Sequence, residues 1–181
     1  MATLDKFEIA PFGPYRFIGK SIYTRLGGQG VGEAIGALWD NSSWVFEALD
    51  GLKEHATAET HNMALINWEK YDEKTKLMGY TVGRFMKAGT PVPEGMDFFD
   101  IPAAMVAKSK VSGTFGDMVD DAANQLTKAA ISQHGKYVGA SWIWSAEVYT
   151  EDTVRDDNVS SSMGFYIPCK EAKKKRRLFK K

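Results

Sequence analysis

Residues 114–150 read "TFGDMVDDAANQLTKAAISQHGKYVGASWIWSAEVYT" and hold the clearest helix pattern in the chain. Its first part, 114–135, predicts a helix, because apolar side chains recur every three or four positions and form one stripe. Thr114 and Asp117 have the spacing of a capping box at its start, and Gly135 suits its end. Residues 137–150 are rich in aromatic and β-branched residues and predict a strand. A helix is therefore followed directly by a strand. The members of the apolar stripe are Phe115, Met118, Val119, Ala122, Leu126 and Ala130.

This helix–strand unit belongs to an order of elements that occurs twice along the chain. The second half is predicted to hold an extended segment, a helix and two strands, at 96–113, 114–135, 137–150 and 159–169. The first half is predicted to hold a strand, a helical region and two strands, at 14–26, 31–54, 61–72 and 74–88. The helical region is interrupted by "DNSS" (40–43), whose residues favour helix caps. Each half therefore reads strand–helix–strand–strand.

The predicted fold class is α+β. Units of this size bury too little surface to be stable alone, so the halves 14–88 and 96–169 are expected to share one antiparallel sheet. The helices are expected on one face of the sheet, and a central groove on the opposite face, where the halves meet. Residues 1–13 are expected to be an N-terminal extension, and 172–181 a disordered basic tail.

Composition restricts the class of protein. The chain has 181 residues, of which 44% are hydrophobic and 25% charged, as in soluble globular proteins. No apolar run approaches the ~20 residues of a membrane span, and the N-terminus lacks a signal-peptide pattern. The single cysteine, Cys169, excludes an internal disulfide framework. These features predict a cytoplasmic protein.

The net charge of zero conceals an uneven distribution. Seven of the 23 basic residues lie in the last ten, "AKKKRRLFKK", which leaves 16 basic against 23 acidic residues in 1–171. Charge alone would attract nucleic acid or an acidic surface weakly to this tail. Only Phe179 interrupts the basic residues with an aromatic ring, so a specific nucleic-acid site is not supported. A separate protein partner that binds the tail stays open as an alternative.

One carboxylate stands within an apolar and aromatic run, "SWIWSAEVYT" (141–150). In a strand, Glu147 shares a face with Tyr149, whereas Trp142 and Trp144 lie on the other face unless a bulge intervenes. An ionised carboxylate in an apolar site is costly, so it changes its pKa or finds a cation. Beside aromatic rings it suits a delocalised organic cation. The alternative is an exposed glutamate on an edge strand that pairs with a lysine.

The chain resembles the GyrI-like effector-binding family, here as a stand-alone member. The matching features are the duplicated order of elements, "GYTVGRF" (79–85), "VPEGMDFFDIPAAMVAKSKVSG" (92–113), the Glu147-x-Tyr149 motif and the closing "YIPCK" (166–170). The resemblance covers about residues 14–171. The chain departs from the family's regulators because no DNA-binding domain precedes the first strand, and it carries two tryptophans just ahead of the glutamate.

The resemblance implies that a hydrophobic small molecule, with cationic aromatic molecules as one class, binds in the central groove above Glu147. Effector binding or toxin sequestration would follow. In some relatives the matching glutamate is implicated in the hydrolysis of strained cyclopropane-bearing toxins. The alternative is therefore a hydrolase in which Glu147 is the general base and Tyr149 orients the water or stabilises a leaving oxygen. Whether the ligand is turned over stays open from the sequence.

Aromatic residues on the neighbouring strands are the expected groove walls. The candidate ligand-binding residues are Glu147, Tyr149, Tyr166, Trp68 and Trp144. Core or interface roles are favoured for Tyr80, Tyr23, Trp44 and Phe98. No metal site is expected, because the three histidines and Cys169 lack ligand spacing. No cofactor is expected either, because "GGQGVGE" (27–33) matches neither phosphate-loop pattern.

Overall fold

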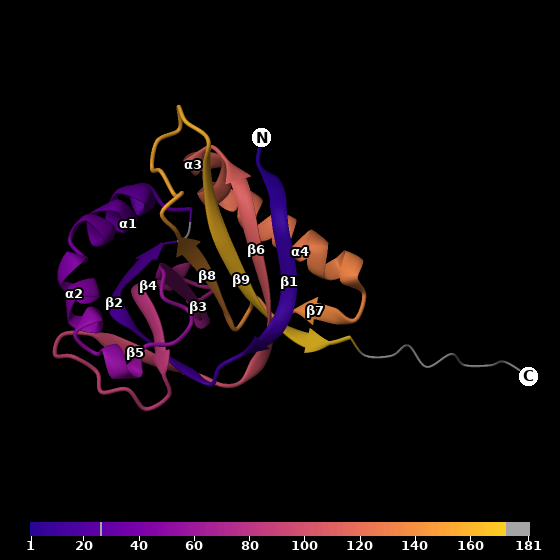
Figure 1. Ribbon diagram of the computed structural model, residues 1–181. Coiled ribbons are helices and arrows are strands. Elements are labelled where there is room, and N and C mark those ends of the chain that lie inside the picture. Colours follow the sequence, from indigo (N-terminus) through magenta and orange to yellow (C-terminus); the bar gives the residue numbers. More distant parts are fainter. Residues whose placement is uncertain (26, 173–181) are drawn as a thin grey trace, which may run out of the picture.

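The computed structural model describes residues 1–25 and 27–172 (Figure 1). Its strands form one antiparallel sheet in the order β1-β6-β9-β8-β3-β4-β2-β5, with β7 paired to β9. The predicted α+β class and the antiparallel sheet are confirmed. The strands are β1 (Thr3–Phe12), β2 (Tyr15–Arg25), β3 (Asn62–Asp72), β4 (Leu77–Lys87), β5 (Asp97–Ile101), β6 (Ala104–Gly113), β7 (Tyr137–Gly139), β8 (Trp144–Tyr149) and β9 (Ser161–Glu171).

The helices separate into two groups along the sequence. The predicted break in the first helical region is confirmed, because α1 ends at Asp40 and α2 begins at Ser43. At the break, the side-chain amide of Asn41 donates a hydrogen bond to the carbonyl of Ala37 (2.8 Å). The helix predicted at 114–135 contains a π turn in which Asp121 leaves the helical conformation. The helical segments are α1 (Val31–Asp40), α2 (Ser43–Asp50), the 3₁₀ turn η1 (Lys53–His55), α3 (Phe115–Asp117), the π turn η2 (Met118–Ala122) and α4 (Ala123–His134).

Two predicted segments differ in the structure. Residues 3–12, expected in an extension, form β1, which pairs with β6 and packs Phe7 and Ile9 near α4. The segment 96–113 forms two strands, because Pro102 lacks the N–H that a continuous ladder requires. β5 therefore pairs with β2 of the first half, while β6 pairs with β9. The expected basic tail lies, apart from Ala172, outside the described residues.

The two faces of the sheet have different partners. The helix face carries Tyr80, Val82 and Phe165, which belong to apolar clusters under α1 and α4. The far face carries Phe85 and Trp144, which pack with Phe12 of β1 at ring-centroid distances of 4.9 and 6.0 Å from Phe12. These rings fill much of the far face, where the sequence predicted the central groove.

Candidate functional site

A cavity with a volume of about 1060 Å³ lies on the helix face of the sheet. Its position corrects the prediction of a groove on the far face, because the two helix groups stand apart over the sheet and leave this space between them (Figure 1). The side chains that define its chemistry are Trp39, Trp68, Tyr80, Glu147, Tyr149 and Phe165. The volume lies slightly above the usual range for small-molecule sites, roughly 300–1,000 Å³.

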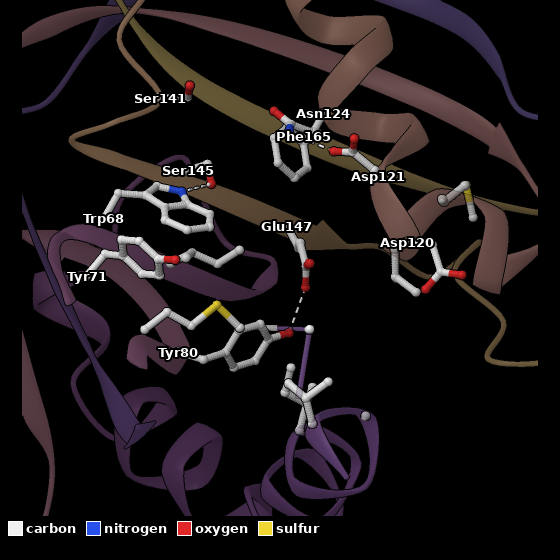
Figure 2. A pocket seen from close by; sticks show the side chains of 18 of the residues that line it. Trp68, Tyr71, Tyr80, Asp120, Asp121, Asn124, Ser141, Ser145, Glu147 and Phe165 are labelled. Carbon is white, nitrogen blue, oxygen red and sulfur yellow. Dashed lines mark hydrogen bonds between the residues drawn. The ribbon is translucent and has the colours of Figure 1, made fainter. Parts of the chain in front are cut away.

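Glu147 stands within this cavity on β8 and is 8% exposed (Figure 2). Its Oε2 atom accepts a hydrogen bond from the hydroxyl of Tyr80 at 2.6 Å and another from the hydroxyl of Tyr149 at 2.8 Å. The indole N–H of Trp39 donates in turn to the Tyr80 hydroxyl at 3.2 Å. Within residues 1–25 and 27–172, Glu147 takes part in no ion pair. The carboxylate is therefore held by neutral donors alone.

Burial controls the protonation of this group of side chains. Desolvation raises the pKa of Glu147 above its ordinary value, and the hydrogen bonds from Tyr80 and Tyr149 oppose that rise. Burial and the nearby carboxylate raise the pKa of both tyrosines well above the usual value. Both hydroxyls therefore remain protonated donors at neutral pH. Among residues 1–25 and 27–172, no cation pairs with the carboxylate to stabilise its charge.

Aromatic rings form the walls around the carboxylate. The Trp39 ring lies 4.5 Å from the Tyr149 ring between centroids, and Phe115 approaches Tyr149 at 6.3 Å. The indole N–H of Trp68 donates to the hydroxyl of Ser145 at 3.0 Å, which fixes that ring beside β8 (Figure 2). Rings held in this way offer their faces to an apolar or cationic ligand without further ordering.

The structure brings Glu147, Tyr149 and Trp68 together at the cavity. Trp144 and Tyr166, the other two predicted ligand-binding residues, lie on the far face. Trp144 is 4% exposed and packs against Phe85, and Tyr166 donates a hydrogen bond to Glu59 at 2.9 Å beside a second cavity of about 500 Å³. The reason is the two-residue period of β8 and β9, which points these side chains away from Glu147.

Trp142 reaches the cavity although strand alternation places it with Trp144. The segment expected as one strand, 137–150, is divided into β7 and β8, and Trp142 lies in the turn between them. Three further cavity residues, Tyr80, Trp39 and Arg155, were not among the predicted ligand-binding residues. Tyr80 was assigned to the core, and nothing in the local sequence shows that its hydroxyl meets Glu147.

Two negative findings concern the part of the chain that the structure describes. No cluster of three or more histidine, cysteine, aspartate or glutamate side chains there could hold a metal ion. No helix there combines the length and the apolar character needed to cross a membrane.

Replacing Tyr80 with phenylalanine is expected to raise the pKa of Glu147 further. The change removes one of the two hydrogen bonds that favour the ionised carboxylate and leaves the Trp39 indole N–H without its acceptor. The lost bonds should also lower the free energy of unfolding by about 1–3 kcal/mol. Carbon-13 NMR titration of the Glu147 carboxyl would measure the pKa, and urea denaturation the stability. Ser21→Ala, which removes a single hydroxyl from β2, is the stability control; an unchanged or lower Glu147 pKa in Tyr80→Phe would contradict the expectation.

Comparison with known proteins relates the fold to solved structures. No protein-family model and no curated protein matches the sequence. The structure of SAV2435 bound to tetraphenylphosphonium is 11% identical, with a TM-score of 0.61 over 92% of this chain and 94% of that one. A putative bacterial transcription regulation protein from Staphylococcus aureus MU50 is 9% identical, with a TM-score of 0.60 over 91% and 98%.

A third structural neighbour is described as a hydrolase. A hydrolase encoded by lin2189 from Listeria innocua is 10% identical, with a TM-score of 0.50 over 91% of this chain and 92% of that one. Likeness at this level of identity concerns the fold. The fold of this chain is consistent with the GyrI-like fold.

Proposed function

We propose that the protein binds a hydrophobic small molecule in the cavity on the helix face, with aromatic cations as the preferred class. The observation that carries the proposal is the buried carboxylate of Glu147, which lacks a cationic partner among the described residues and is surrounded by aromatic rings. Effector binding and toxin sequestration both use such a site.

The energetics of Glu147 favour a cationic guest. Burial makes the ionised form costly, as the raised pKa reports, and the tyrosine hydroxyls offset only part of that cost. A ligand cation would supply the missing charge pairing, and the ring faces of Trp39 and Trp68 would add cation–π attraction of about 2 kcal/mol in a desolvated site. The structural neighbour bound to tetraphenylphosphonium supports this class of ligand for the fold.

The test compares two ions of nearly the same shape and opposite charge. Tetraphenylphosphonium is expected to bind and to quench tryptophan fluorescence, because Trp39 and Trp68 line the cavity. Tetraphenylborate is expected to bind at least about tenfold more weakly, since Glu147 repels it. Isothermal titration calorimetry at pH 7.5 would measure both affinities. Equal affinities for the two ions, or no binding of either, would contradict the proposal.

A second candidate function is hydrolysis of a strained, cyclopropane-bearing electrophile. Two observations favour it: the pKa of Glu147 is raised toward the range of a general base, and two tyrosine hydroxyls lie within hydrogen-bond distance of the carboxylate. Glu147 would take a proton from water while the water oxygen bonds to a ring carbon. The ring C–C bond would break, and the departing carbon would take its electron pair and receive the proton from Glu147, which restores the carboxylate. Multiple turnovers of product, lost in Glu147→Gln, would separate this candidate from simple binding.

A further inference from the structure

Arg155 is a cationic residue that lies over the aromatic wall of the cavity. Its guanidinium carbon is 4.8 Å from the centre of the Trp39 ring and 5.8 Å from that of the Tyr149 ring. Both rings belong to the group around Glu147, and Arg155 itself lines the cavity. A charged group of the protein therefore sits at the same wall as the proposed ligand.

The backbone on both sides of Arg155 is anchored by hydrogen bonds. On one side, the amide of Val154 donates to the hydroxyl of Ser161 at 2.7 Å. On the other side, the carboxylate of Asp157 accepts from the amide of Gly116 at 2.6 Å. The loop between β8 and β9 is thus fastened both to the sheet and to α3. These contacts anchor the loop residues on either side of Arg155.

Among the described residues, the Arg155 guanidinium donates no hydrogen bond. An arginine side chain has five N–H donors. Within residues 1–25 and 27–172, the recorded polar contact of Arg155 is a 3.7 Å approach to the carboxylate of Asp40, whose side chain is 76% exposed. An exposed ion pair of that length contributes little. The donors of Arg155 are therefore available to an anionic group.

Arg155 and Glu147 carry opposite charges, and both lie next to Tyr149. The Tyr149 hydroxyl bonds to Glu147 at 2.8 Å, whereas the centre of its ring lies 5.8 Å from the Arg155 guanidinium. The two groups form no ion pair with each other. Burial raises the pKa of Tyr149 and Arg155 opposes that rise, whereas Arg155 is not among the causes that shift the pKa of Glu147. Both charged groups therefore line one cavity without forming an ion pair with each other.

From this arrangement we propose that the cavity prefers amphoteric aromatic ligands, which carry a cationic ring system and an anionic group. The cation would lie against Glu147, and Arg155 would bind the anionic group at the mouth of the cavity through charge-assisted hydrogen bonds. This inference rests on the proposed binding of aromatic cations and adds a second charged subsite to it. It makes Arg155 a residue that determines specificity.

The test uses two dyes that differ in one ester. Rhodamine 6G is a cation whose carboxyl group is esterified, and rhodamine 19 is its free acid with an ionised carboxylate. The wild-type protein is expected to bind rhodamine 19 about tenfold more tightly than rhodamine 6G, as fluorescence anisotropy would measure. In Arg155→Gln the ratio should fall to about one, mainly through weaker binding of rhodamine 19.

Two control variants make the result specific. Lys53→Gln makes the same change in net charge at an exposed position of η1 and should keep the wild-type ratio. Arg155→Lys keeps the charge but loses the planar donor pair, so an intermediate ratio is expected. Circular dichroism would establish that each variant is folded.

The outcomes separate this inference from the proposed function. If Arg155→Gln binds both dyes with the wild-type ratio, or if the wild-type protein does not prefer rhodamine 19, the amphoteric subsite is refuted while cation binding stands. If the wild-type protein binds neither dye and also fails to bind tetraphenylphosphonium, the proposed function fails and this inference fails with it.

Discussion

Replacing Glu147 with glutamine should weaken the binding of tetraphenylphosphonium by about a hundredfold or more at pH 7.5. The carboxylate is buried among aromatic rings and forms no ion pair with the described residues. A bound cation would therefore be its main source of charge pairing. At an effective dielectric constant of about 20, such a pair contributes on the order of 3 kcal/mol at contact distance, which corresponds to more than a hundredfold in affinity.

Glutamine is the informative replacement because it preserves the local geometry. Both tyrosine hydroxyls donate to the same atom, Oε2 of Glu147, and the amide oxygen of glutamine can accept the same two bonds. Loss of affinity in this variant would then reflect loss of charge. Glu69→Gln, at an exposed position of β3, is the matched control for the change in net charge. If Glu147→Gln binds tetraphenylphosphonium as tightly as the wild-type protein, the carboxylate does not provide the charge pairing.

The same substitution has a defined effect on the ligand-free protein. Burial raises the pKa of Glu147 above its ordinary value of 4.5, so the folded state binds this proton more tightly than the unfolded state. The stability contributed in this way is fully present below pH 4.5 and is lost as the pH rises through the raised pKa. Glu147→Gln does not ionise. Its free energy of unfolding should therefore exceed that of the wild type at neutral pH, and the difference should shrink toward pH 4.5.

Ionisation of Glu147 has opposite effects on stability and on ligand binding: it lowers the free energy of unfolding and raises the affinity for a cation. A cation binds the ionised carboxylate, so the affinity of the wild-type protein for tetraphenylphosphonium should rise as the pH increases through the pKa of Glu147. The variant should show a flat pH profile over the same range. Calorimetry and urea denaturation between pH 4.5 and 8 would measure the two profiles.

The local part of the site was predictable from the sequence. Alternation along 143–149 places Glu147 and Tyr149 on one face, and the structure has both at the cavity. The same alternation puts Trp144 on the opposite face, which conflicts with its choice as a ligand-binding residue; the structure follows the alternation. Trp142 departs from the pattern because the strand begins only at Trp144. Over short distances, the two-residue period of a strand was the reliable rule.

The long-range part of the site depended on sheet order and helix placement. Tyr80 meets Glu147 because β3 lies between β4 and β8 in the sheet, and the sequence does not define that order. Trp39 comes from α1 and Arg155 from the loop between β8 and β9, and the two side chains meet at the same wall. Distant residues also determine which face of the sheet carries the cavity, because Phe12 of β1 packs against Phe85 and fills part of the far face. Residues 1–13 were expected to be an N-terminal extension, so this contact was not anticipated.

The close approach of β2 and β4 explains a glycine in the motif "GYTVGRF". Gly83 is paired with Gly19, and a Cβ atom added to Gly83 would lie 2.0 Å from the carbonyl oxygen of Ile18. A Cβ atom on Gly19 would lie 2.0 Å from the carbonyl oxygen of Val82. Both obstacles are backbone atoms, so no side-chain rotation can relieve the contact. Any residue other than glycine would force the two strands apart.

Replacing Gly83 with alanine should therefore lower the free energy of unfolding by about 3 kcal/mol or more, or prevent folding altogether. Gly36→Ala is the matched control, because its Cβ atom would meet nothing within 4 Å in the interior of α1, where alanine should stabilise the helix by up to about 1 kcal/mol. Urea denaturation of both variants would measure the difference. Because β4 also carries Tyr80 to Glu147, a folded Gly83→Ala protein should bind tetraphenylphosphonium more weakly than the wild-type protein. Wild-type stability in Gly83→Ala would show that the strands tolerate a wider spacing and that the glycine pair does not set the position of Tyr80.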